Sequence, residues 1–146
     1  MAMTSKSLNY ALYAWRDNRI RLKVTQGEYG IKLAQFTLMD DSGAINLSTA
    51  TAILFNGIKR NGTGFSVDCS VVNVTKGTIA VQEEIEMTDI HGDAQCAIEV
   101  ISDNGVVKFD GITLCVSPNE IGELITASES FKSLETALNK VALLTP

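Results

Sequence analysis

The residues best suited to chemistry surround the single histidine, His91, in the stretch Asp89-Ile90-His91-Gly92-Asp93. An imidazole oriented by a carboxylate can act as a general base, and either aspartate could supply that carboxylate. Glycine and aspartate are also typical of a polar turn, and a strand is expected to begin at Ala94. We favour the turn, and a small hydrolase that uses His91 is the alternative.

A second group of titratable side chains is the acidic run Glu83-Glu84-Ile85-Glu86-Met87-Thr88-Asp89. Clustered carboxylates can bind a hard cation such as Ca²⁺. The run lacks the spacing of an EF-hand loop, in which the ligands alternate around a glycine before a final glutamate. We therefore interpret it as a solvated acidic face.

Motifs of other chemistries are missing from the sequence. It contains no GxSxG, no HExxH and no phosphate-binding glycine loop. The basic, glycine-rich stretch 56–64 could touch a phosphate or a partner, but a long hairpin tip explains it equally well. The sequence thus predicts a protein that is not an enzyme, with no cofactor and no metal.

Three cysteines, Cys69, Cys96 and Cys115, are widely spaced and form no CxxC pair. A redox dithiol or a zinc site would need closer spacing. All three lie in apolar stretches expected to be strands. We therefore expect small buried thiols without disulfides, in a protein made in a reducing compartment.

Length and charge limit the function further. A chain of 146 residues suggests one domain, and 45% hydrophobic against 20% charged residues supports a packed core. The formal net charge of −5 argues against nucleic-acid binding. No apolar run approaches the roughly 18 residues of a membrane span, and no secretory signal is visible. We expect neither nucleic acid nor membrane as a partner.

The elements that must position these residues are mostly strands. Residues 20–24 alternate apolar and basic side chains, and further β-rich runs cover 31–39, 50–55, 65–74 and 78–82. Residues 96–116 predict a hairpin with a type I′ turn at Asn104-Gly105. The apolar phase of the return strand changes after Phe109, so we expect a bulge or bend at Gly111. Short strands at this spacing indicate an antiparallel immunoglobulin-like β-sandwich over residues 18–117.

The two ends of the chain differ from the sandwich. Residues 1–17 form an N-terminal arm that contains Tyr10, Tyr13 and Trp15, and it could be an extra strand or a short docked helix. Residues 1–25 carry five basic residues and one acid. We favour a solvated basic face, and the alternatives are head-to-tail contacts between copies or docking onto an acidic partner.

A long C-terminal α-helix is predicted over residues 118–146. Ser117-Pro118-Asn119-Glu120 combines an N-cap serine, an N1 proline and a glutamate three residues after the cap. Its apolar positions alternate steps of three and four, as in a heptad seam. The seam consists of Leu124, Ala127, Phe131, Leu134, Leu138 and Val141. It could fold back onto its own sandwich or associate with other copies, and Phe and Leu at the inner positions are compatible with a trimer.

The order of these parts resembles a known family. The stretches are Arg21-Leu22-Lys23-Val24-Thr25-Gln26-Gly27-Glu28, Gln35 to Gly43, Ile45 to Phe55 and Phe131 to Val141. Over residues 18–142 the chain is similar to the N-terminal domain of the baseplate upper protein of tailed phages that infect Gram-positive bacteria. The resemblance implies a sandwich fixed into a baseplate, followed by a helical region that associates with copies and leads to a receptor-binding end. It implies no catalytic residues.

Together these observations predict a structural phage or prophage baseplate or tail protein, located in the virion and made in the bacterial cytoplasm. Its partners would be other baseplate or tail proteins and further copies of itself, in support of host attachment. The sequence stops at Pro146 without a receptor-binding region, so we expect a fragment or a relative that only scaffolds. The alternative is a carbohydrate- or surface-binding module, which needs a platform of exposed aromatic residues. Exposure of Tyr10, Tyr13 and Trp15 together on one face would favour it.

Overall fold

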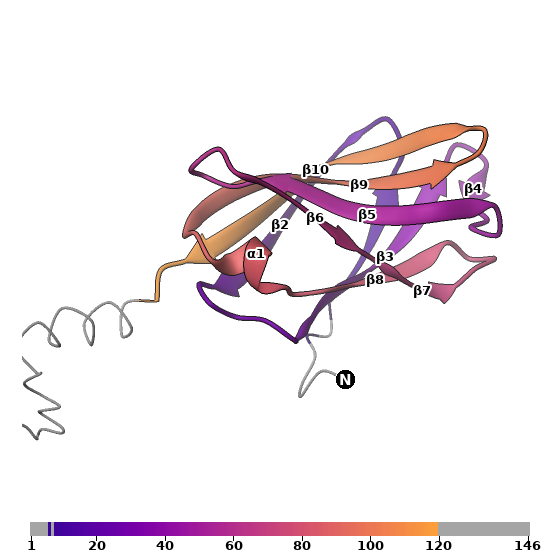
Figure 1. Ribbon diagram of the computed structural model, residues 1–146. Coiled ribbons are helices and arrows are strands. Elements are labelled where there is room, and N and C mark those ends of the chain that lie inside the picture. Colours follow the sequence, from indigo (N-terminus) through magenta and orange to yellow (C-terminus); the bar gives the residue numbers. More distant parts are fainter. Residues whose placement is uncertain (1–5, 7, 120–146) are drawn as a thin grey trace, which may run out of the picture.

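The computed structural model describes residue 6 and residues 8–119, and this part of the chain forms two β-sheets and one short helix (Figure 1). The first sheet contains β1 (Asn9–Tyr13), β3 (Lys32–Asp40), β4 (Gly43–Ala44), β7 (Ser70–Asn73) and β8 (Thr78–Gln82). The second sheet contains β2 (Asp17–Thr25), β5 (Ala50–Ile58), β6 (Gly64–Asp68), β9 (Gly92–Ser102) and β10 (Gly105–Ser117). The helix α1 (Ile85–Thr88) lies at the end where the described chain leaves β10. The prediction of a mostly β, two-layered fold is confirmed.

The sheets are not purely antiparallel, and that part of the prediction was wrong. The strand orders are β1-β3-β8-β7, with β4 also on β3, and β2-β10-β9-β5-β6. The pairs β1–β3 and β2–β10 are parallel, whereas the remaining pairs of the described sheets are antiparallel. The physical reason is that a period-two pattern fixes which face of a strand is buried, but not the direction of its neighbour. Both parallel pairs join segments that are distant in sequence, where no turn signals the pairing.

The core lies between the two sheets and follows the alternation of the strands. In β2 the side chains of Ile20, Leu22 and Val24 are buried, while the basic residues between them are exposed. Three phenylalanines are fully buried at the centre, and burying each stabilises the fold by about 1.5–3 kcal/mol. They are Phe36, Phe55 and Phe109. Met87 of α1 is also fully buried, so the short helix closes one end of the core.

The bulge predicted at Gly111 is confirmed. The register of β10 shifts between Phe109 and Ile112, and both of these side chains are fully buried. Two inward residues three positions apart require one extra residue, which the bulge supplies. Gly111 has a φ of 84°, and a Cβ there would lie 2.9 Å from the carbonyl carbon of Asp17. Glycine is required because the neighbouring strand leaves no room for a side chain.

The predicted β9–β10 hairpin is present, but its turn differs from the prediction. Ser102 pairs with Gly105, so the two loop residues are Asp103 and Asn104. Among the described residues, Trp15 and Arg19 are the non-glycine residues with positive φ, so Asn104 does not adopt a type I′ conformation. The register is set by the core pair Phe109–Ile98, whose side chains are both fully buried. Packing of the core thus overrides the local preference of the Asn-Gly dipeptide.

The apolar run 65–74, expected to be one strand, is divided between the two sheets. β6 pairs with β5 in the second sheet, and β7 pairs with β8 in the first. The change takes place at Cys69, whose N–H still donates to the carbonyl of Ile53 at 2.9 Å. The chain therefore crosses from one sheet to the other along one side of the sandwich, which an apolar pattern alone does not reveal.

The N-terminal aromatic segment is a strand, one of the two alternatives left open by its sequence. β1 lies on the edge of the first sheet, and its Leu12 is fully buried. At the other end, residues 120–146 lie outside the described residues. The heptad seam from Leu124 to Val141 therefore stays a prediction. Within the described part, no helix has the length and apolarity needed to cross a lipid bilayer.

Candidate functional site

The residues around His91 do not assemble a general base. His91 is exposed in the link between α1 and β9. Asp89 instead accepts a hydrogen bond from Lys59 Nζ at 2.9 Å, and Asp93 pairs with Arg21 at 3.5 Å. The two carboxylates expected to orient the imidazole are thus engaged with basic side chains. No observation in the described part of the chain supports the hydrolase.

The acidic run 83–89 contains α1 and divides between surface and interior. Glu86 and Asp89 are exposed, as a solvated face requires. Glu83 is fully buried, so the interpretation of a solvated face was wrong for this residue. Within residues 8–119, no group of three or more histidine, cysteine or carboxylate side chains is placed to hold a metal ion.

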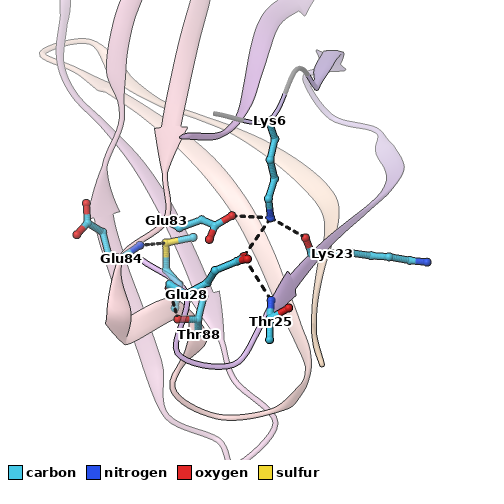
Figure 2. A network of polar contacts seen from close by, with 8 residues as sticks. Lys6, Lys23, Thr25, Glu28, Glu83, Glu84 and Thr88 are labelled. Atoms are coloured by element: carbon cyan, nitrogen blue, oxygen red, sulfur yellow. Dashed lines mark hydrogen bonds and ion pairs between the residues drawn. The ribbon is translucent and has the colours of Figure 1, made fainter. Parts of the chain in front are cut away.

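Glu83 belongs to a polar cluster of three charged residues from three separate segments, Lys6, Glu28 and Glu83, which we call the latch (Figure 2). Lys6 Nζ lies 2.7 Å from Glu83 Oε2 and 3.2 Å from Glu28 Oε1. It also donates to the backbone carbonyl of Lys23 at 3.1 Å. Glu28 Oε1 accepts the N–H of Thr25 at 3.4 Å. One ammonium group is therefore shared between two carboxylates and a carbonyl.

The environment pushes the two carboxyl groups of the latch in opposite directions. The pKa of Glu83 is raised to about 7, chiefly by burial and also by the neighbouring Glu28 carboxylate, although contact with Lys6 opposes both effects. Burial also acts to raise the pKa of Glu28, but contacts with Glu83, Lys6 and the Thr25 N–H outweigh it and lower the pKa. Neither oxygen of Glu83 accepts a hydrogen bond of good geometry. Glu83 is thus a buried carboxylic acid whose pKa lies close to neutral pH.

The loop between β2 and β3 joins the latch to the point where the chain leaves the sandwich. The Gln26 backbone N–H donates to the carbonyl of Ser117 at 2.8 Å. Its side chain donates to the carbonyl of Asp89 at 3.0 Å and accepts the N–H of Asn119 at 3.2 Å. Thr88 Oγ1 donates to the carbonyl of Glu28 at 2.6 Å. One loop therefore contacts the N-terminal segment, α1 and the end of β10.

Sequence reasoning missed Lys6 and Glu28 as members of a site. The three charged residues of the latch stand far apart in the chain, and none of them belongs to a motif. The one available signal was the alternation of β8, which places Glu83 two positions after the buried Val81 and therefore on the inward phase. Because Glu83 is also the first residue of the acidic run 83–89, the charge pattern indicated an exposed side chain instead.

A different surface feature lies along the edge of β7. This strand ends the order of its sheet, so one side carries no neighbouring strand. Val71, Val72 and Val74 are all exposed there. A groove of about 320 Å³ lies beside the strand. It is lined by Leu47, Ala50, Thr51, Ala52, Ile53, Asp68, Cys69 and Val71.

The aromatic residues near the N-terminus do not form a platform. Tyr10 is half-buried and stacks on Phe36, with ring centroids 5.9 Å apart. Tyr13 points to the other face of β1, and the Arg16 guanidinium covers its ring at 4.8 Å. Of the three aromatic residues, Trp15 is the one with a largely exposed side chain, at 73%. The condition set for a carbohydrate-binding module, three aromatics exposed on one face, is therefore not met.

The expectation of buried thiols holds for Cys96, whereas Cys69 and Cys115 are half-buried. Cys69, Cys96 and Cys115 are free thiols. Burial raises the pKa of both Cys69 and Cys96 to about 12, which suppresses the reactive thiolate at neutral pH. These two positions therefore offer no nucleophile.

Comparison with known proteins gives the relationship of the whole chain. The chain is similar to a solved structure, the N-terminal domain of phage TP901-1 ORF48, with a TM-score of 0.51 and 12% sequence identity. The match covers 79% of this chain and 99% of that chain, and at this identity it shows a shared fold. No curated protein matches the sequence. The model of the BppU N-terminal domain matches residues 5–142, so the chain belongs to that family of phage baseplate proteins.

Proposed function

We propose that this protein is a structural component of a phage or prophage baseplate, in which the sandwich docks onto another baseplate protein. The observation that carries the proposal is the family match over residues 5–142, nearly the whole chain. The protein would accordingly reside in the virion and support host attachment.

Self-association through the C-terminal region is the second part of the proposal. Its support is the heptad spacing of the six seam residues from Leu124 to Val141. The chain leaves the sandwich at Asn119, next to Gln26 at one end of the fold. A helix that starts there could join copies without covering either sheet.

A double substitution in the seam tests this association. We expect the parent to be an oligomer in light scattering and Phe131→Asp/Leu138→Asp to be a folded monomer, because two charges would enter an apolar interface. For a trimer the mass falls to about one third. Ser133→Asp/Asn139→Asp adds the same charge outside the seam and should keep the parent mass. A monomeric parent would contradict self-association.

The edge of β7 is the surface we assign to docking. Natural edge strands are commonly protected by charges or proline, and β7 contains neither. The exposed Asp68 stands just before the strand and the exposed Lys76 follows it, so the two ends carry opposite charges. An extended segment of a baseplate protein with the complementary arrangement could pair in one direction only. Val71 and Val72 would give that segment apolar contacts.

Replacing Val72 by aspartate should separate docking from folding. We expect an unchanged circular dichroism spectrum, because Val72 is 53% exposed, but a loss of at least tenfold in incorporation into assembled baseplates. Val106→Asp is the matched control, since Val106 is 52% exposed on the β9–β10 hairpin. Incorporation would be measured by quantitative mass spectrometry of purified particles. Equal incorporation of both variants would reject β7 as the docking edge.

A further inference from the structure

The N-terminal segment is fastened to the sandwich by backbone bonds and by one side chain. Lys6 N–H donates to the carbonyl of Lys32 at 3.0 Å, and Gln35 N–H donates to the carbonyl of Leu8 at 2.9 Å. Beyond these bonds, the Lys6 side chain reaches to the two carboxylates of the latch (Figure 2). The shorter of the two ion contacts is the one to Glu83.

Among the described residues, two charged groups face the Glu83 carboxyl, Lys6 from the N-terminal segment and Glu28 from the β2–β3 loop. Lys23 offers its backbone carbonyl, and its side chain points away from the cluster, as does that of Glu84 (Figure 2). The Lys32 ammonium group donates to the side chain of Gln35 at 2.9 Å. Ionised Glu83 therefore gives the latch two negative charges and one positive charge, whereas protonated Glu83 leaves one of each.

The proton on Glu83 and the position of Lys6 are thermodynamically linked. Contact with Lys6 favours the ionised form of Glu83 and lowers its pKa. By reciprocity, ionised Glu83 must hold Lys6 more tightly than protonated Glu83 does. Because the pKa of Glu83 is about 7, the change occurs near neutral pH.

We propose that Glu83 acts as a proton-operated switch, which holds the N-terminal segment through Lys6 when ionised and loosens it when protonated. Lys6 keeps its contact with Glu28 in both states, so the segment is loosened and not fully lost. The loosening is confined to the N-terminal segment, because protonation of Glu83 removes a buried negative charge and so does not destabilise the rest of the sandwich. The proposal is independent of the baseplate assignment, since it concerns the chain itself.

Hydrogen exchange of the Lys6 and Gln35 amides tests the switch. Protection factors, which are corrected for the intrinsic pH dependence of exchange, would be measured by nuclear magnetic resonance at pH 5.5 and pH 8. We expect the parent to lose about tenfold in protection at pH 5.5, the equivalent of one pKa unit of linkage. Core amides such as that of Leu114 should keep their protection and so distinguish local release from unfolding.

Three variants complete the experiment. Glu83→Gln imitates the protonated acid and should show the low protection at both pH values. Lys6→Met removes the ammonium group and should behave in the same way, which provides a second route if Glu83→Gln folds poorly. Glu84→Gln, the neighbour that points away, should match the parent. Equal protection of the parent at both pH values, or a retained pH dependence in Glu83→Gln, would overturn the proposal.

Discussion

Replacing Gly111 by alanine is expected to lower the free energy of unfolding by about 3 kcal/mol, from two additive causes. The first cause is the φ of 84°, which costs an L-residue about 1–2 kcal/mol. The second is steric, because the new Cβ would meet the backbone of β2 at Asp17 and Asn18. Relieving that contact would displace β2 from β10 or push the bulge outward, at a cost of about 1–3 kcal/mol.

Urea unfolding followed by circular dichroism measures the loss, and Gly62→Ala is the control. Gly62 has a nearly identical φ of 89°, but a Cβ there has nothing within 4 Å. Gly62→Ala should therefore lose only the backbone cost of about 1–2 kcal/mol. If both variants lost the same free energy of unfolding, the close approach of β2 to the bulge would contribute nothing to the cost of Gly111→Ala.

The stability of the sandwich should decrease as the pH rises from about 4.5 to 7, by about 3 kcal/mol. The pKa of Glu83 is raised from 4.5 to about 7 in the folded protein, chiefly by burial. In this window the folded state therefore binds a proton that the unfolded state has released, so raising the pH favours unfolding. Glu28 acts in a different window, because its lowered pKa makes its contribution disappear only in more acidic solution.

Urea unfolding at a series of pH values isolates this effect. Glu83→Gln cannot ionise, so its stability should stay nearly constant between pH 4.5 and 7, apart from other titrating groups. Glu86→Gln, at an exposed position on α1, should reproduce the slope of the parent. A parent whose stability does not fall across this window would show that Glu83 titrates normally.

The two-layered fold was predictable because its pattern is local. Alternation of Ile20, Leu22 and Val24 assigned the buried face of β2, and the change of phase after Phe109 located the bulge at Gly111. Strand direction was not predictable, since β2 meets β10 only after the chain has built most of the second sheet. The division of residues 65–74 between two sheets has the same origin, because an apolar run does not record which sheet it joins.

The latch could not be derived from spacing. Its charged residues come from the N-terminal segment, the β2–β3 loop and the residue after β8, and only the tertiary fold brings them together. The turn at Asp103 and Asn104 shows that a local signal can also be overridden by tertiary packing. There the local signal was strong, but the core pair Phe109–Ile98 decided the register.

The position of β10 has a mechanical consequence. This strand lies between β2 and β9 and is hydrogen-bonded to both, and the chain passes directly from it to Asn119. Tension applied to the chain beyond Ser117 would act along the strand axis and load both ladders in shear. Hydrogen bonds loaded in shear resist together, whereas those at a peeled edge strand break one after another. A load applied at the end from which the chain continues would therefore be shared by both ladders of β10.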